Sequence, residues 1–145
     1  EFTDVDRVNF EARLNLMRTG WGQENPAFRQ MFTTLYIPDA SSEIWQSFNE
    51  LMKLATAPDM AARIQEVNSG MDVLDILHQV EAPTLILHAK GDAAVPFEEG
   101  RRLAASIPDA QLVSLDSNNH PPVALGSETQ RMYSEIHTFL AEHPV

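Results

Sequence analysis

The chain has 145 residues, of which 43% are hydrophobic, and its ten Lys and Arg against 21 Asp and Glu give a formal net charge of −11. This composition predicts a soluble globular protein with its own core, and the absence of cysteine excludes disulfides, thiolate metal sites and a cysteine nucleophile. The acidic charge argues against direct contact with nucleic acid or membrane, and without a membrane-length apolar run or a signal-peptide pattern we expect a cytoplasmic location.

The first 80 residues have the pattern of helices separated by turns. Apolar residues recur at helical spacing in five stretches, and Asn, Pro and Ser stand where helices are expected to begin or end. The predicted helices are Asp6–Arg18, a segment begun by Asn25-Pro26 and ended by Pro38, one capped by Ser41 or Ser42, one opened by Pro58-Asp59, and Asp72–Val80.

After Ala82-Pro83 the apolar period changes from helical to strand-like. Thr84–His88 is short and almost continuously apolar, which suits a parallel strand covered on both faces, and Gln111–Leu115 is a second strand. A helix is predicted between them at Pro96–Ser106, and a closing helix follows Ser127, which begins a Ser-x-x-Gln capping-box pattern. Residues 81–145 therefore predict a β-α-β-α segment with parallel strands, so the fold class is α/β.

Two polar residues follow the two predicted strands, Asp92 after the first and His120 after the second. Because adjacent parallel strands lie only about 4.8 Å apart, their carboxyl ends can bring this carboxylate and imidazole into hydrogen-bonding range. A buried carboxylate on one ring nitrogen fixes the tautomer and leaves the other nitrogen to act as a general base. The pair therefore predicts two of the three members of a catalytic triad.

The run Ala82–Asp92, with Val95-Pro96, Ile107–Ala110 and Asn119-His120 after it, resembles the C-terminal part of an α/β-hydrolase. The resemblance implies that Asp92 is the triad acid, that His120 is the base, and that residues 1–80 are a helical lid before the hydrolase segment 81–145. Segments Gly20–Phe32 and Val95–Gly100 are also similar to hydrolase regions within bacterial LuxR-type transcriptional regulators.

The Gly-x-Ser-x-Gly nucleophile motif of that family is absent, because none of the six glycines brackets a Ser, Cys or Asp in this spacing. We therefore expect a partial fold that is inactive alone, with the nucleophile half lying upstream of Glu1. Pro121-Pro122, directly after His120, is a second departure, since two prolines stiffen the loop and could misdirect the imidazole.

Other candidate site residues have simpler interpretations. A set of aromatic residues in the helical region is most simply core, although it could line an apolar substrate pocket: Trp21, Phe28, Phe32, Trp45 and Phe48. His88 is interpreted as a strand residue near the sheet end with a satisfied hydrogen bond, the alternative being a position near the pocket. Because His78, His137 and His143 lack metal-ligand spacing, we expect no metal and no cofactor.

Two functions of different classes follow. The first is a serine hydrolase of esters or similar acyl compounds, with a small-molecule substrate. The second is a non-catalytic ligand-sensing or interaction domain of a LuxR-type regulator, whose DNA contact would come from a flanking domain. Since two parallel strands cannot form a stable sheet alone, we also expect self-association or pairing with the missing N-terminal half.

Overall fold

The structure is a computed structural model that describes residues 4–120 and 126–144, the side chains of residues 5 and 6 excepted. Its contacts divide the chain into two compact units. The helical unit comprises Glu1–Thr34 and Ser41–Met71, and the sheet unit comprises Leu35–Ala40 and Asp72–Val145. The predicted division into a lid at 1–80 and a hydrolase segment at 81–145 concerns family architecture and stays a prediction.

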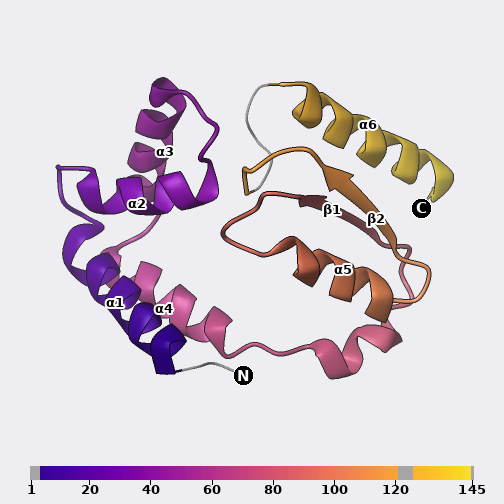
Figure 1. The fold of residues 1–145 in the computed structure, drawn as a ribbon, viewed down its shortest axis with the longest axis horizontal. Helices are drawn as coiled ribbons and strands as arrows, with labels where there is room; N and C mark the ends of the chain where they lie inside the picture. The colour runs from indigo at the N-terminus through magenta and orange to yellow at the C-terminus, as the bar shows by residue number, and fades with distance from the viewer. Residues whose placement is uncertain (1–3, 121–125, 145) are drawn as a thin grey trace. The chain divides into compact units, whose positions relative to one another are not determined.

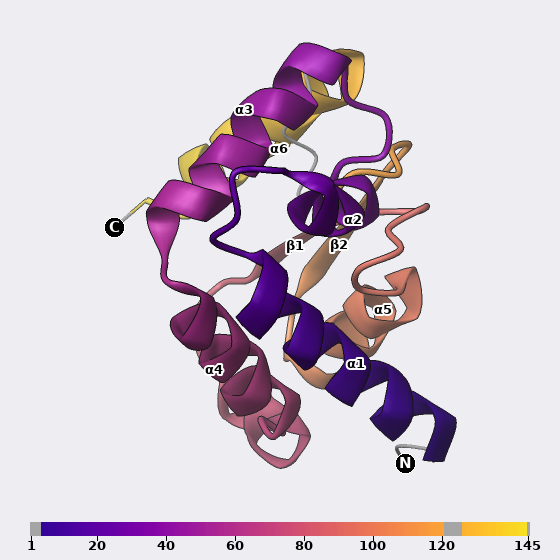
Figure 2. The same ribbon diagram turned by 90° about the vertical axis from the view of Figure 1, so that its left-hand side faces the viewer.

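The helical unit is built from α1 (Asp4–Gly20), α2 (Ala27–Tyr36, its last two residues in the sheet unit), α3 (Ser42–Ala55) and α4 (Pro58–Ser69). Helices α1 and α4 lie side by side (Figure 2). The predicted start signals act as expected. Asn25 Oδ1 accepts a hydrogen bond from Ala27 N, Ser41 Oγ accepts one from Ile44 N, and Pro58 is the first residue of α4.

Trp21 and Phe32 form the aromatic part of the helical unit's core. Their rings meet edge to face with centroids 5.7 Å apart, and Trp21 Nε1 donates a hydrogen bond to Met52 O at 3.0 Å. Gly20 lies so close to Phe28 that a Cβ at this position would stand 2.2 Å from Phe28 Cγ. The C-terminal end of α1 therefore packs directly against α2.

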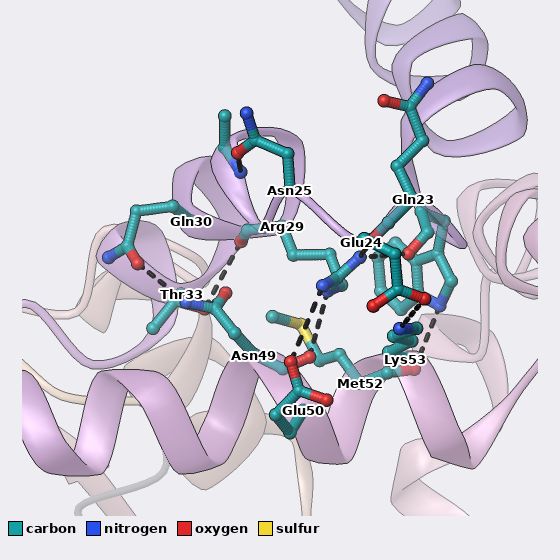
Figure 3. A network of polar contacts seen from close by, with 12 residues as sticks. Gln23, Glu24, Asn25, Arg29, Gln30, Thr33, Asn49, Glu50, Met52 and Lys53 are labelled. Carbon is teal, nitrogen blue, oxygen red and sulfur yellow. Dashed lines mark hydrogen bonds and ion pairs between the residues drawn. The ribbon is translucent and has the colours of Figure 1, made fainter.

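A charged side chain, Arg29, is fully buried in the same unit (Figure 3). Its Nε donates to Asn49 O at 2.9 Å, and its Nη1 donates to Trp21 O and Gln23 O at 2.6 Å each. Its Nη2 lies 3.9 Å from a carboxylate oxygen of Glu50. We call these five residues the Arg29 network; it ties the turn between α1 and α2 to α3.

The sheet unit contains the 3-10 helix η1 (Leu74–Gln79), β1 (Leu85–Ala89), α5 (Phe97–Ser106), β2 (Gln111–Leu115) and α6 (Ser127–Glu142). The two strands are parallel, in a register that runs from Leu85 opposite Gln111 to Ala89 opposite Leu115. Helices α5 and α6 lie on opposite sides of this pair (Figure 1). The predicted α/β segment with parallel strands is thus present.

Three local expectations differ from the structure. The first strand begins at Leu85, so Thr84 precedes it, and most residues of both strands are half-buried although a helix lies on each side. The strands are less covered than expected because the sheet has two strands and open edges. The capping box is not formed, since Ser127 is itself the first residue of α6. The stretch Asp72–Val80 forms a 3-10 helix instead of an α-helix, and Asp72 Oδ1 accepts from Leu74 N to start this tighter turn.

Candidate active site

Two loops leave the carboxyl ends of β1 and β2 and stay paired beyond the strands. Lys90 N donates to Leu115 O at 2.9 Å, and Gly91 N donates to Ser117 O at 3.0 Å. These bonds continue the strand register into the loops. The chain segments just before Asp92 and His120 therefore remain adjacent, which brings the two side chains together.

Asp92 is held by backbone amides on one side and faces the imidazole on the other. Its Oδ1 accepts hydrogen bonds from Ala94 N and Val95 N at 2.8 Å each, and its Oδ2 lies 2.5 Å from His120 Nδ1. The side chain is only 3% exposed. The two amides fix the orientation of the carboxylate, since an Asp in this turn satisfies the amides two and three residues ahead.

His120 is more accessible than its partner, with 38% of its side chain exposed. A carboxylate at Nδ1 assigns the proton of the neutral ring to Nδ1 and leaves the lone pair on Nε2. The ring also lies beside Tyr36, with centroids 5.9 Å apart, and His120 N donates to Tyr36 O at 2.5 Å. The pair thus has the geometry of a general base supported by a buried acid.

The remaining histidines are apart from this pair. The His88 ring meets Phe97 edge to face at 5.5 Å, and a Cβ on Gly100 would stand 2.7 Å from its Cδ2, so His88 serves the contact between β1 and α5. His78 and His137 are exposed, and His143 is half-buried on Phe139. The predicted effect of Pro121-Pro122 falls outside the described residues.

The predicted pocket aromatics all lie in the helical unit. Trp21 and Phe32 are buried against each other, whereas Phe28, Trp45 and Phe48 are half-buried. Packing therefore accounts for the first two, and the other three retain exposed surface. Their role as pocket residues stays a prediction.

Sequence reasoning missed the residues that hold the histidine loop. Asp39 and Asn118 are joined through side chains, Asn119 is 3% exposed and bonds back to Asp39, and Tyr36 accepts from His120. The pair Asn118-Asn119 directly before His120 is the signal that could have been followed. The two asparagines bond to Asp39, which lies 79 or 80 positions away, so local sequence patterns could not predict these contacts.

A cavity of about 830 Å³ lies at the opposite end of the strands. It is lined by residues that precede β1 and β2, among them Glu81, Ala82, Pro108 and Asp109, with His143 of the chain's C-terminal part. Its place at the amino ends of the strands separates it from Asp92 and His120.

Within residues 4–120 and 126–144, no three His, Asp or Glu side chains are grouped as metal ligands would be. None of the helices in that part of the chain combines the length and the apolar composition needed to cross a membrane.

The sequence is similar to one protein family and to a hydrolase of known sequence. The sequence profile of a family described as TAP-like protein matches residues 57–143. A Pseudomonas syringae protein, RutD, provisionally assigned as a carbamate hydrolase, is 31% identical over 74 residues, which are 50% of this chain and 29% of RutD.

Solved structures show the same fold. An esterase from Exiguobacterium antarcticum matches with a TM-score of 0.75 and 16% identity, covering 92% of this chain and 48% of the esterase. A hydrolase from Oleispira antarctica matches with a TM-score of 0.73 and 20% identity, covering 92% and 47%. The chain therefore spans about half the length of these two structures and less than a third of RutD.

Proposed function

Because the chain belongs to the TAP-like protein family and has the α/β-hydrolase fold, we propose that Asp92 and His120 are the acid and base of a serine hydrolase triad. The observation that carries the proposal is the 2.5 Å contact between Asp92 Oδ2 and His120 Nδ1, with the carboxylate buried and the imidazole partly exposed. A Gly-x-Ser-x-Gly nucleophile is absent from these 145 residues, so the serine must come from outside them.

The reaction uses the two ring nitrogens of His120 differently. Nε2 takes the proton of the serine hydroxyl as its oxygen attacks the acyl carbonyl, and Asp92 stabilises the imidazolium that forms. The imidazolium then gives this proton to the leaving group, and the acyl–oxygen bond of the substrate breaks. A water molecule, deprotonated by Nε2, attacks the acyl-enzyme. The bond between the acyl carbon and the serine oxygen then breaks, the imidazolium returns its proton to that oxygen, and the carboxylic acid product leaves.

We assign the substrate to the class of esters and related acyl compounds. The names of the relatives support this class, since an ester and a carbamate share an acyl carbonyl that a serine can attack. Phe28, Trp45 and Phe48 are our candidates for apolar contacts with the substrate because they retain exposed surface. Trp21 and Phe32 are buried, and we keep them as more remote candidates for the same pocket.

The test is hydrolysis of an aryl ester by a longer protein that carries these residues together with the nucleophile. We expect His120→Ala to abolish turnover, and Asp92→Asn to lower kcat by about 10⁴-fold because the imidazole loses its orienting acceptor. His137→Ala, on the exposed face of α6, is the matched control and should hydrolyse at the parent rate. Unchanged turnover in His120→Ala would remove the proposed role.

A second candidate is a non-catalytic sensing domain of a cytoplasmic LuxR-type regulator. It is favoured by the resemblance of segments Gly20–Phe32 and Val95–Gly100 to hydrolase regions of such regulators. The flanking sequence separates the two functions. A serine in an upstream Gly-x-Ser-x-Gly supports catalysis, whereas a replaced serine with a helix-turn-helix beyond Val145 supports sensing.

A further inference from the structure

The segment Leu35–Ala40 connects helices α2 and α3 but packs with the sheet unit. It supplies the backbone oxygen of Tyr36 to His120 N, and the ring of Tyr36 lies beside the imidazole. A stretch that is distant in sequence therefore contacts the candidate base through both its main chain and a side chain.

Asp39 makes the strongest connection between this segment and the histidine loop. Its carboxylate accepts from Asn118 Nδ2, at 3.1 Å to Oδ1 and 2.9 Å to Oδ2, and from Asn118 N at 3.2 Å. In return, Asp39 N donates to Asn119 Oδ1 at 3.0 Å. Because the bonds run in both directions, they fix the relative position of the two chain segments as well as their separation.

The amide of Asn118 also reaches the turn that carries the acid. A Cβ on Gly91 would stand 1.9 Å from Asn118 Oδ1, so the main chain just before Asp92 lies against this amide. The nitrogen of the same amide faces Asp39. Asn118 therefore lies between Asp39 and the Asp92 turn, and it immediately precedes Asn119 and His120.

We propose that Asp39 is a positioning residue, which acts through Asn118 and Asn119 to hold the His120 imidazole against Asp92. This inference rests on the proposed hydrolase function. The requirement is geometric, since catalytic groups must be held within about 0.5 Å of the productive geometry and a 1 Å displacement can cost about 100-fold in rate. Asp39 and Asn118 are both exposed, so their bonds contribute little to overall stability and their main effect is on the loop.

The first measurement is the ¹⁵N spectrum of the His120 side chain in the 145-residue protein. We expect a hydrogen-bonded Nδ1–H in the parent and a mixture of tautomers in Asp39→Ala, with no large change in the unfolding midpoint. Asp39→Asn keeps one acceptor oxygen and should show a smaller effect. If Asp39→Ala fails to fold, the ¹⁵N spectrum of His120 in Asp39→Asn tests the inference. Asp59→Asn, an exposed carboxylate in the first turn of α4, is the control and should match the parent.

The second measurement is ester hydrolysis by the longer protein. Asp39→Ala should lower kcat by about 10- to 100-fold with KM nearly unchanged, because the base is misplaced while substrate binding is not. Asn118→Ala should have the same effect, and the double variant should be no worse than either, since both changes break one connection. Additive losses, or a parent-like tautomer in Asp39→Ala, would overturn the inference.

The two measurements also separate this inference from the proposed function. If His120→Ala still hydrolyses the ester, the proposed function fails. The spectrum of His120 needs no turnover, so a tautomer change in Asp39→Ala would still support the positioning role of Asp39.

Discussion

The Arg29 network and the Asp92–His120 pair are both built around a buried charged or polar side chain, yet their partners differ. Arg29 is bonded to three backbone carbonyls, which do not titrate, and its own charge is permanent. His120 faces a buried carboxylate, keeps 38% of its side chain exposed, and can gain or lose a proton. The first arrangement suits a fixed structural connection, and the second suits proton transfer.

The comparison also predicts what each region contributes to the folded protein. Removing Arg29 would take a donor from the buried carbonyls of Trp21 and Asn49, which is costly because such groups lose water on folding. Weakening the contact between Asp92 and a partly exposed His120 leaves the imidazole able to reach water. Changes in the Arg29 network should therefore appear mainly in stability, and changes at the pair mainly in chemistry.

The largest effect on stability is expected from Arg29→Met. Two buried carbonyls, Trp21 O and Asn49 O, would lose this donor. At about 1–3 kcal/mol for each unsatisfied buried group we expect a loss of about 2 kcal/mol or more. The measurement is the free energy of unfolding from urea denaturation. The contacts of Arg29 lie within the helical unit, so folded Arg29→Met should keep the parent tautomer of His120.

Arg63→Met is the control for this change, because Arg63 is 70% exposed and lies 3.8 Å from Glu66 on the same helix. It should alter stability by less than about 0.5 kcal/mol. If Arg29→Met and Arg63→Met lowered the free energy of unfolding equally, the burial of Arg29 would not be the source of its contribution to stability.

An intermediate effect is expected from two glycines, one in each region. Gly20→Ala would drive a Cβ into Phe28, and we expect a loss of about 1–3 kcal/mol from the strained core. Gly91→Ala would displace Asn118, an exposed side chain that can move, so it should cost less stability but change the ¹⁵N spectrum of His120. Thermal unfolding and that spectrum together compare the two sites.

Gly70→Ala is the control for both, because its Cβ would meet Val67 O at an ordinary 3.7 Å. It should change neither the unfolding temperature appreciably nor the His120 spectrum. A change of the His120 ¹⁵N spectrum in Gly20→Ala, together with a parent-like spectrum in Gly91→Ala, would contradict the expected difference between the two regions.

Local patterns predicted the sheet unit better than the buried polar contacts. The limits of β2 at Gln111–Leu115 were predicted as observed, and the meeting of Asp92 with His120 followed from the shared edge of parallel strands. The burial of Arg29 was not predictable, because its partners Trp21 and Asn49 come from different turns and helices. The contact of Asp39 could not be predicted from local patterns either, because its partner Asn118 is 79 positions away in the sequence.

The smallest effect is expected at the exposed edge of the helical unit, where Lys53 Nζ donates to Glu24 Oε1 at 2.7 Å. This hydrogen bond and the charge of Lys53 hold the pKa of the Glu24 carboxyl below its ordinary value. A carboxyl whose pKa is lowered by folding contributes stability that is present above its ordinary pKa and lost as pH falls through the lowered pKa. Lys53→Met should therefore return the pKa of Glu24 toward its ordinary value and weaken the loss of stability in acid. The ¹³C titration of the Glu24 carboxyl measures this shift, with Lys90→Met as the control; an unchanged titration in Lys53→Met would contradict it. Salt should affect the two regions differently. Because Glu24 is fully exposed, added salt should reduce the shift of its pKa in the parent protein. The hydrogen bonds from the buried Arg29 to backbone carbonyls should be insensitive to salt.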